Sequence, residues 1–364
     1  MNQKYKIPSD LTSKILTIGP DYRNHRGGVG AVIEVYSRYF EKFNFIPSYK
    51  PGSGLYKVAV FILGLIKLVY TLITNREIVI IHIHGASYGS FYRKYVVFII
   101  GKYIFRKKII YHIHGGGFQL FYNKSNSFSK RLIEKLLGQS NFVICVSQSW
   151  YEYYVRNFKF QAIELLPNII DYPTILKKSS ETGNITFLYL GLICEQKGIF
   201  DLLKVIVKNK EQYRGKIKLL IGGNGETHRL MDLIEKHKIN DIVEFLGWIT
   251  KEDKINALNM ADVYILPSYN EGLPISILEA MSYGRAIIST NVGGIPEIVR
   301  NKENGLIIEP GNQEQLEQSL AYFLENPEDI KKYGAVSVKL VQNYLPDSVL
   351  GKLFDIYKTV LLNE

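Results

Sequence analysis

Short apolar runs alternate with helix-like stretches along almost the whole chain of 364 residues. This alternation limits the fold, because strands separated by helical stretches form parallel sheets with helices packed on their faces. The strand-like runs fall into two series. The first series is 14–19, 78–84, 108–114 and 142–147, and the second is 185–191, 217–222, 243–246, 263–267, 286–290 and 305–308. The sequence therefore predicts an α/β protein with two doubly wound parallel-sheet halves.

A linker is expected between the two series. Residues 167–173 contain two prolines, and a polar run follows at 177–184. Segments of this composition commonly connect domains. We expect an N-terminal domain over 1–175 and a C-terminal domain over 182–345, which agrees with the usual size of roughly 150 residues per domain.

Positive charge is concentrated in the first half of the chain. Residues 1–180 contain 25 Lys and Arg but 9 Asp and Glu, whereas the remainder contains 20 and 25. This asymmetry indicates an anionic partner, and nucleic acid, an acidic phospholipid surface or an anionic lipid-phosphate acceptor would qualify. Binding to nucleic acid would explain only the basic charge of the first half, so we expect no nucleic-acid partner. The cluster 106–108 is too short to decide, and it also fits a solvated connection before a strand.

Residues 55–74 form an apolar run long enough to span a bilayer. Lys67 lies inside it and would cost roughly 2.5–3.5 kcal/mol at the bilayer centre. The default expectation is therefore a packed core helix, and a true span is the least favoured reading. The alternative is an interfacial helix whose apolar face enters the headgroup region while lysines meet anionic lipid, extended by the run 93–108.

The predicted compartment is the cytosol. The N-terminus is polar and is not followed by the apolar stretch that a secretory signal requires. The two cysteines, Cys145 and Cys194, lie far apart in strand-like runs, which fits reduced core thiols better than a disulfide.

Two carboxylates flank a loop-to-helix junction in the second half. Glu271 lies in the turn after the strand at 263–267, and Glu279 lies in a helix predicted over 275–283. The start of such a helix exposes backbone N–H groups and the positive end of its dipole, which suits an anion. An ionised Glu can accept two O–H bonds from a diol. Together they predict a site for a sugar phosphate or a nucleotide sugar.

The junction resembles the E-x7-E signature of family 4 glycosyltransferases, because Glu271 and Glu279 are separated by seven residues and followed by Gly-Gly-Ile-Pro-Glu at 293–297. The resemblance implies the GT-B fold, in which two Rossmann-like domains face each other across a cleft. It also implies that a C-terminal helix at 347–363 packs back on the first domain. Glu271 would face the donor sugar hydroxyls, Glu279 would bind the ribose, and the backbone of Gly272, Leu273 and Pro274 would meet the diphosphate or sugar. Taken alone, each carboxylate could be a solvated surface residue.

A glycine-rich loop at 26–30 follows the first strand. The family has a similar pair of glycines here, which implies a diphosphate-facing role for Gly27 and Gly28. A simple tight turn would explain the loop as well. A dinucleotide fingerprint is disfavoured, because Ile33 stands where a third small residue belongs.

Histidines end two successive strands of the first half. His112 and His114 fall on the same side of their strand. His114 resembles the family histidine that contacts the donor sugar or the acceptor, and a hydrogen-bonded structural role is the alternative. A zinc site built from His82, His84, His112 and His114 is much less favoured, because no acidic or Cys ligand stands at metal spacing.

The second half adds further candidate residues through the resemblance. Lys197 matches a lysine that clamps the donor diphosphate, whereas Leu192 stands where Arg is common. The missing charge-assisted contact is worth roughly 1.5–3 kcal/mol. Gly223 and Asn224 lie in a glycine-rich turn that could equally be an ordinary strand-to-helix connection. Gly247 and Trp248 resemble the segment whose backbone reads the base.

The resemblance implies a retaining glycosyltransferase. The expected reaction moves a hexosyl group from a nucleoside diphosphate sugar, with UDP-sugar favoured, to a lipid-linked or polysaccharide acceptor in cell-surface glycan biosynthesis. Glu271, His114 and Lys197 would be the catalytic residues. No metal or other cofactor is expected, and the sequence contains no Asp-x-Asp pair. The enzyme would be cytoplasmic and peripheral on the inner face of the cell membrane, held there by its basic N-terminal domain.

Two alternatives remain open from the sequence. One is a soluble glycosyltransferase that acts on a small sugar or sugar-phosphate acceptor. The other is a non-catalytic nucleotide-sugar binding module, which Leu192 makes conceivable. Glu271, Glu279, Lys197 and His114 argue against that module.

Overall fold

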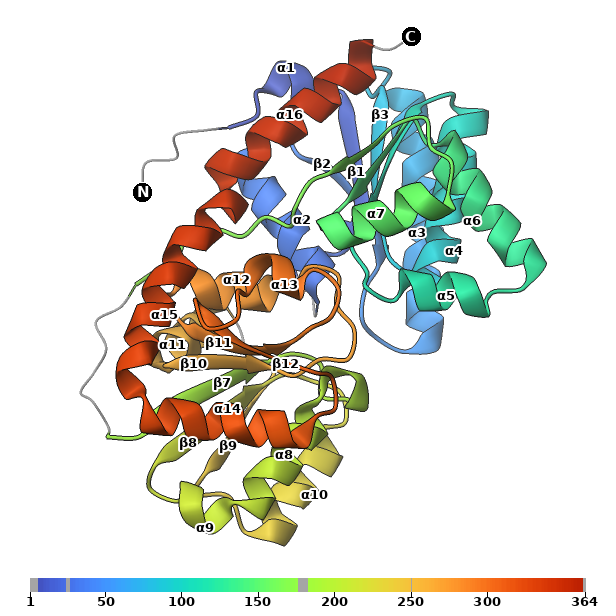
Figure 1. The fold of residues 1–364 in the computed structure, drawn as a ribbon. Helices are drawn as coiled ribbons and strands as arrows, with labels where there is room; N and C mark the ends of the chain where they lie inside the picture. The colour runs from blue at the N-terminus through green and yellow to red at the C-terminus, as the bar shows by residue number, and fades with distance from the viewer. Residues whose placement is uncertain (1–5, 24–26, 176–182, 250, 363–364) are drawn as a thin grey trace. The chain divides into compact units, whose positions relative to one another are not determined.

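The computed structural model describes residues 6–23, 27–175, 183–249 and 251–362. The chain divides into two compact units, which are Met1–Asp171 with Tyr344–Glu364, and Tyr172–Asn343. Figure 1 shows that each unit is built from a sheet with helices on its faces. Arg26 of the glycine-rich loop and residues 177–182 of the expected linker lie outside the described residues.

The sheet of unit 1 has six parallel strands in the order β2-β1-β3-β4-β5-β6. Its strands are β1 Ile15–Pro20, β2 Asn44–Tyr49, β3 Ile80–Gly85, β4 Lys108–Ile113, β5 Phe142–Cys145 and β6 Ile163–Leu165. The central strands are buried on both faces, as their continuous β-branched runs require. In the register of β3 and β4, His84 lies opposite His112.

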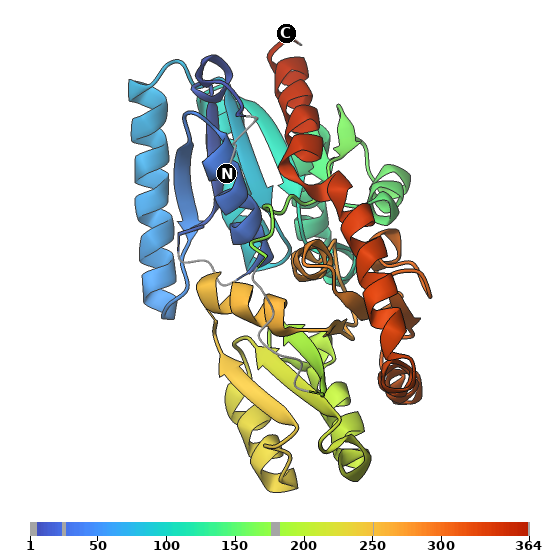
Figure 2. The same cartoon turned by 90° about the vertical axis from the view of Figure 1, so that its left-hand side faces the viewer.

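Helices cover both faces and one edge of this sheet (Figures 1 and 2). They are α1 Ser9–Thr12, α2 Gly28–Tyr39, α3 Gly54–Thr74, α4 Gly89–Ile99 continued by a π-helix at Ile100–Ile104, α5 Phe118–Lys124, α6 Ser127–Gln139, α7 Gln148–Asn157 and α16 Pro346–Leu362. Side chains of Asn126 and Ser147 cap α6 and α7. The C-terminal helix α16 packs in unit 1, where the hydroxyl of Tyr357 lies 2.7 Å from Nδ1 of His82.

The sheet of unit 2 also has six parallel strands, in the order β12-β11-β10-β7-β8-β9. Its strands are β7 Ile185–Leu190, β8 Ile217–Gly222, β9 Val243–Gly247, β10 Val263–Leu266, β11 Ala286–Thr290 and β12 Gly305–Ile308. Its helices are α8 Ile199–Lys208, α9 Lys210–Tyr213, α10 Thr227–His237, α11 Lys251–Met260, α12 Ile275–Ser282, α13 Ile295–Ile298, α14 Gln313–Glu325 and α15 Pro327–Leu340. Two parallel sheets with helices confirm the predicted α/β class.

Helix α3 corrects one expectation. The predicted packed core helix is wrong, because Leu68 and Leu72 are the buried residues of this fully described helix. Figure 2 shows α3 in light blue at the margin of unit 1, where it packs along the edge strand β2. A Cβ atom at Gly64 would lie 2.7 Å from the carbonyl oxygen of Pro47, so the helix and strand backbones approach closely there.

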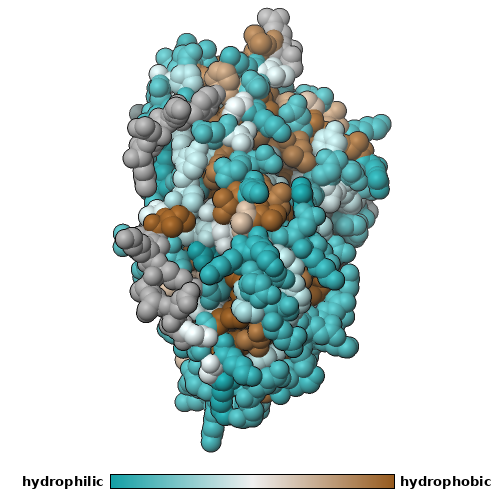
Figure 3. All heavy atoms as spheres, turned by 60° about the vertical axis from the view of Figure 1, so that its left-hand side comes forward, coloured by the Kyte–Doolittle hydropathy of each residue, from teal (hydrophilic) through white to brown (hydrophobic). Residues whose placement is uncertain are grey.

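Among the described residues, α3 is the one helix long and apolar enough to cross a membrane, and 17% of its most apolar window is buried. A core helix of the same composition would be mostly buried. On the face drawn in Figure 3, by comparison, brown hydrophobic side chains form separate patches among teal hydrophilic ones. The unusual feature of α3 is therefore its exposure.

Candidate functional site

The loops that follow β7, β10 and β11 in unit 2 pack closely against one another at the carboxyl end of the sheet. Gly198 adopts a positive φ of 70°, and a Cβ atom there would lie 1.9 Å from the carbonyl oxygen of Pro267. Gly293 has a φ of 53°, and its Cβ would lie 2.0 Å from the carbonyl oxygen of Glu271. Only glycine fits these two positions without strain. The loop after β7 and the loop after β11 are thereby fixed against the loop after β10.

This packing brings Lys197 and Glu271 together. Lys197 ends a short 3₁₀ turn after β7, and Glu271 lies between β10 and α12. The Nζ atom of Lys197 is 2.5 Å from Oε1 of Glu271. The carboxylate is buried, and 27% of the lysine side chain is exposed. The pair therefore places the partly exposed ammonium group of Lys197 beside the buried carboxylate of Glu271.

A second ion pair joins α12 to α11. Glu279 belongs to α12, and its Oε1 is 2.5 Å from Nζ of Lys254 on α11. Both side chains remain partly exposed. Lys254 was not predicted from the sequence, because a single lysine on a polar helix carries no signal that links it to a carboxylate 25 residues later.

The start of α12 faces the turn that carries Glu271. Gly272 and Leu273 lie between that carboxylate and Pro274, which precedes the helix. The N-cap residue Pro274 makes no side-chain cap hydrogen bond to the helix. The carbonyl oxygen of Gly272 accepts a hydrogen bond from the amide of Gly294 at 2.7 Å. The turn is therefore held in place while the first helical amides can meet an anion.

The remaining predicted residues of unit 2 lie at the ends of β8 and β9. The amide of Gly223 donates to the carbonyl of Gly247 at 2.8 Å, and the carbonyl of Asn224 accepts from the amide of Ile193 at 2.7 Å. Both bonds are backbone contacts that tie these turns together. Trp248 follows Gly247 and is 44% exposed. A flat apolar surface is thus available close to the turn after β8.

At the departure noted in the sequence, a leucine occupies the loop after β7. Leu192 is 47% exposed. Arg229 of α10 reaches the same loop, with NH2 2.5 Å from Oε1 of Glu195 and NH1 3.0 Å from Oε2 of Glu226. Two carboxylates bind this single guanidinium and give the group a net negative charge, so as it lies it does not supply the missing contact to a diphosphate.

In unit 1, the two predicted glycines lie at the start of α2. Gly27 precedes the helix with an extended φ of 178°, and Gly28 is its first residue. No described atom lies within 4 Å of a Cβ built at Gly27. The described residues around position 27 leave room for a side chain, so they do not explain the glycine. The family resemblance explains it by a ligand that approaches the backbone at this position.

His114 is part of a buried hydrogen-bonded chain. Its Nδ1 donates to the side-chain oxygen of Asn168 at 2.9 Å, so its Nε2 accepts from Nδ1 of His84 at 2.8 Å. Burial lowers the pKa of His114 to about 4, against the weaker opposite effect of the Asn168 bond. The ring is neutral near pH 7, and a substrate hydroxyl at Nε2 would have to replace His84.

Three of the buried histidines could hold a metal. His82, His84 and His112 each offer a ring nitrogen within 4.8 Å of the others. Burial lowers the pKa of all three, which suits neutral ligands. Yet the rings of His82 and His84 stack with centroids 4.3 Å apart, and so pack face to face. The arrangement also fits an aromatic core cluster.

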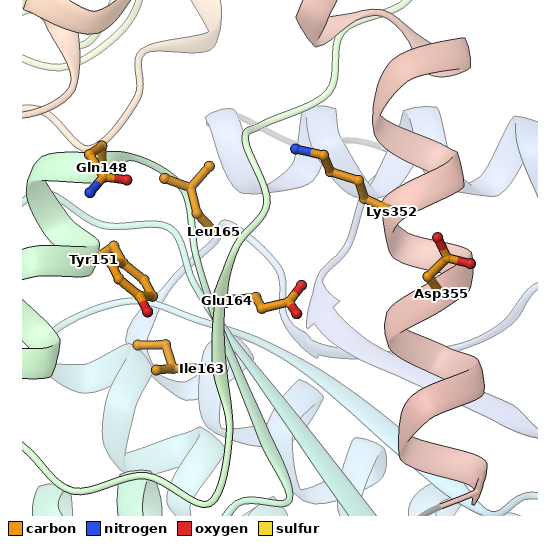
Figure 4. A pocket seen from close by; sticks show the side chains of 7 residues that line it. All are labelled: Gln148, Tyr151, Ile163, Glu164, Leu165, Lys352 and Asp355. Carbon is orange, nitrogen blue, oxygen red and sulfur yellow. The ribbon is translucent and has the colours of Figure 1, made fainter.

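A separate hollow of about 420 Å³ lies in unit 1 (Figure 4). It is lined by Gln148, Tyr151, Ile163, Glu164, Leu165, Lys352 and Asp355. Figure 4 shows that these side chains come from α7, β6 and α16. None of the candidate site residues lines it.

Two family models match the chain. The model described as glycosyl transferases group 1 matches residues 171–337, and the model for glycosyltransferase family 4 matches residues 32–172. An uncharacterized glycosyltransferase of Haemophilus influenzae is 31% identical over 173 residues, covering 47% of this chain and 48% of that protein. A human protein, named as a subunit of phosphatidylinositol N-acetylglucosaminyltransferase, is 29% identical over 189 residues, covering 50% and 38%.

Solved structures show the same fold. Sucrose-phosphate synthase from Thermosynechococcus elongatus matches with a TM-score of 0.76 at 17% identity, covering 96% of this chain and 100% of that one. The Anabaena protein Alr3699/HepE in complex with UDP-glucose matches with a TM-score of 0.75 at 16% identity, covering 95% and 99%.

These comparisons, together with two parallel six-stranded sheets, show the GT-B fold. Within that class, the chain belongs to the family 4 type of glycosyltransferases, as the E-x7-E junction implied. The chain spans about half the length of the curated relatives it matches.

Proposed function

We propose that the protein transfers a hexosyl group from a nucleoside diphosphate sugar, with UDP-sugar favoured, and that the anomeric configuration is retained. The observation that carries the proposal is the Lys197–Glu271 pair beside the start of α12, the helix on which Glu279 lies. This arrangement combines a cation, backbone amides and two carboxylates. The cation and the amides suit a diphosphate, and the two carboxylates suit the hydroxyls of a sugar and a ribose.

Each group has a definite part in the proposed reaction. Glu271 orients the donor sugar through its hydroxyls, and Glu279 binds the ribose diol. Lys197 and the first amides of α12 offset the charge that grows on the diphosphate as it leaves, and this stabilisation is preorganised. In unit 1, Gly27, Gly28 and His114 keep the roles that the family resemblance implies. Gly223, Asn224, Gly247 and Trp248 keep theirs toward the nucleotide.

The chemical step balances without an added cofactor. A hydroxyl oxygen of the acceptor forms a bond to the anomeric carbon, and the bond from that carbon to the diphosphate oxygen breaks. The acceptor proton passes to the departing phosphate oxygen on the same face of the sugar. Lys197 supplies the positive charge that a metal ion supplies in other transferases. The proposal therefore includes no metal requirement.

For the acceptor, we propose a lipid-linked or polysaccharide chain in cell-surface glycan synthesis, reached from the cytoplasmic side of a membrane. The excess of Lys and Arg in residues 1–180 supports an anionic lipid-phosphate acceptor. The names of two relatives agree with this choice. One is the human phosphatidylinositol N-acetylglucosaminyltransferase component, and the other is a putative colanic acid biosynthesis glycosyltransferase of Escherichia coli. A small soluble acceptor is the second candidate.

The test is saturation-transfer NMR of the purified protein against UDP-, GDP- and ADP-sugars, with and without EDTA. We expect selective binding that survives EDTA and disappears in Glu279→Ala. The matched control is Glu317→Ala, because Glu317 pairs with Lys208 at 2.7 Å on the surface of the same unit. Absence of binding across the panel, or binding that EDTA abolishes, would contradict the proposal.

Transfer itself is tested with the donor that binds. Incubation with membrane lipid extracts and with free sugars separates the two acceptor classes, and the proton NMR coupling at the new anomeric centre reports its configuration. Product in the lipid phase with the donor's configuration is expected. Binding without product from any acceptor would favour the non-catalytic module.

A further inference from the structure

We propose that the exposed side of α3 docks unit 1 on an anionic phospholipid surface and lies in the plane of the headgroups. We define this outer face by Leu55, Ile62, Leu63, Ile66, Tyr70 and Ile73, each of which is more than half exposed. The proposal goes beyond glycosyl transfer, because surface attachment needs neither donor nor acceptor.

The outer face is continuous. Its residues recur at intervals of three, four and seven, so at 100° per residue they fall within one stripe about 100° wide. The helix has 21 residues and is about 30 Å long. Soluble monomers rarely expose contiguous apolar patches larger than a few hundred Å². A surface of this length therefore has a binding role.

A second apolar stripe attaches α3 to its own domain. Leu68 and Leu72 are buried, and Phe61 and Leu65 pack partly buried against the core of unit 1. The close approach of Gly64 to Pro47 fixes the same side of the helix. To cross a bilayer as a free helix, α3 would have to break these contacts. Attachment on one side and exposure on the other fit an interfacial helix.

The charge of the residues around α3 indicates which partner binds the outer face. Residues 42–133 contain 14 Lys and Arg and a single acid, Glu77. In a symmetric dimer the same patch of both copies would meet, which would bring these positive charges together. An anionic lipid surface instead attracts them. The structure and sequence therefore favour lipid over a second copy of the chain.

Basic side chains lie beside the outer face and near the start of α3. Lys67 is exposed on α3 itself, next to this face on the helical wheel. At the start of α3, on the side of the helix that faces β2, the Nζ of Lys57 lies 6.0 Å from the centre of the Tyr49 ring, and the guanidinium carbon of Arg93 from α4 lies 5.1 Å from the same centre. A long basic side chain at the position of Lys67 can reach lipid phosphates while the apolar residues enter the headgroup layer.

The orientation has a consequence for the site. Since α3 begins directly after the carboxyl end of β2, its first turn lies at the same end of the sheet as Gly28, the start of α2 after β1. Docking along α3 would therefore bring the ligand-binding end of this sheet to the margin of the lipid surface.

The experiment is flotation of the full chain with vesicles of phosphatidylcholine alone and of phosphatidylcholine mixed with phosphatidylglycerol. We expect binding to the anionic vesicles at low salt, weaker binding at high salt, and little binding to phosphatidylcholine alone. Leu63→Glu combined with Ile66→Glu places two acids on the outer face and should lower the partition coefficient by roughly tenfold or more.

The matched control replaces two exposed apolar helix residues of unit 2, Met231→Glu with Val338→Glu, and should keep wild-type binding. Lys57→Gln with Lys67→Gln leaves the apolar face intact and should reduce the salt dependence. Circular dichroism and thermal melting establish that each variant is folded.

Three results would overturn the proposal. They are equal binding of Leu63→Glu/Ile66→Glu and wild type, resistance of bound protein to alkaline extraction, which indicates a span, and self-association that the double variant abolishes without any vesicle binding by wild type. Donor binding is measured separately on vesicle-free protein, so failure of docking and failure of the proposed transfer can be distinguished.

Discussion

Lys197 and Glu271 form an ion pair across two loops, with Nζ and Oε1 2.5 Å apart, although 74 residues separate them in the chain. The ion pair with Glu271 holds the long lysine side chain in one position at the margin of the site. Such preorganisation avoids the cost of ordering a long side chain during binding.

The first prediction concerns this lysine. Lys197→Met should weaken UDP binding by roughly 10- to 100-fold, the value of one charge-assisted hydrogen bond, while uridine binding changes little. Isothermal titration with both ligands gives the comparison. Lys208→Met, which removes an exposed ion pair with Glu317, is the control and should leave both affinities unchanged. Equal loss of UDP and uridine binding would assign Lys197 to the nucleoside instead.

The second prediction concerns Glu279. Glu279→Gln should weaken uridine and UDP by the same factor, roughly tenfold or more, because the ribose diol loses an ionised acceptor in both ligands. Lys254→Met keeps that carboxylate and should keep uridine binding. The same titrations test both variants. Loss of UDP alone in Glu279→Gln would contradict a ribose role.

Much of the fold could be predicted, because buried parallel strands read as continuous apolar runs. The exceptions are instructive. Strand β2, Asn-Phe-Ile-Pro-Ser-Tyr, was missed because it contains a proline, which an edge strand tolerates and a central strand does not. Strand β6 is three residues long and gives no periodic signal.

For the candidate site, the sequence named candidate residues but could not give their contacts. The E-x7-E spacing located Glu271 and Glu279, whereas their partners Lys197 and Lys254 come from other elements that only the folded chain brings near. For α3, composition showed apolar residues on more than one side but could not show which side the domain covers. Exposure is a property of the packing, so the sequence favoured the wrong environment.

The third prediction is a pH dependence of stability. Burial lowers the pKa of His114 to about 4, below its usual value near 6.5, so the unfolded chain binds the proton more readily. The stability contributed by the neutral ring is therefore present above pH 6.5 and is lost as the pH falls toward 4. From this group alone, the free energy of unfolding should fall by about 3 kcal/mol between pH 7 and pH 4.

Urea unfolding of wild type and His114→Gln at several pH values measures this effect. The variant should show a smaller loss of stability on acidification, by about the stated amount, because glutamine does not titrate. His237→Gln, which replaces a histidine at the last turn of α10, is the control. Identical pH profiles for wild type and His114→Gln would show that this ring is solvated in the folded protein.

The fourth prediction concerns the seam between α3 and β2. In the interior of a helix, Gly→Ala is ordinarily stabilising by about 1 kcal/mol. At Gly64 the added methyl would lie 2.7 Å from the carbonyl oxygen of Pro47, a backbone atom that cannot turn aside. Gly64→Ala should therefore lower the free energy of unfolding by roughly 1–3 kcal/mol.

Gly351→Ala provides the comparison, because Gly351 lies within α16 and no described atom approaches its Cβ position within 4 Å. This variant should be neutral or more stable than wild type in the same urea titration. The two variants make the same chemical change in two packing environments of unit 1. We therefore expect their effects on the free energy of unfolding to have opposite signs. If Gly64→Ala were also stabilising, α3 would not pack against β2, and its second apolar stripe, which includes Leu68 and Leu72, would have to face solvent or lipid as the outer face does.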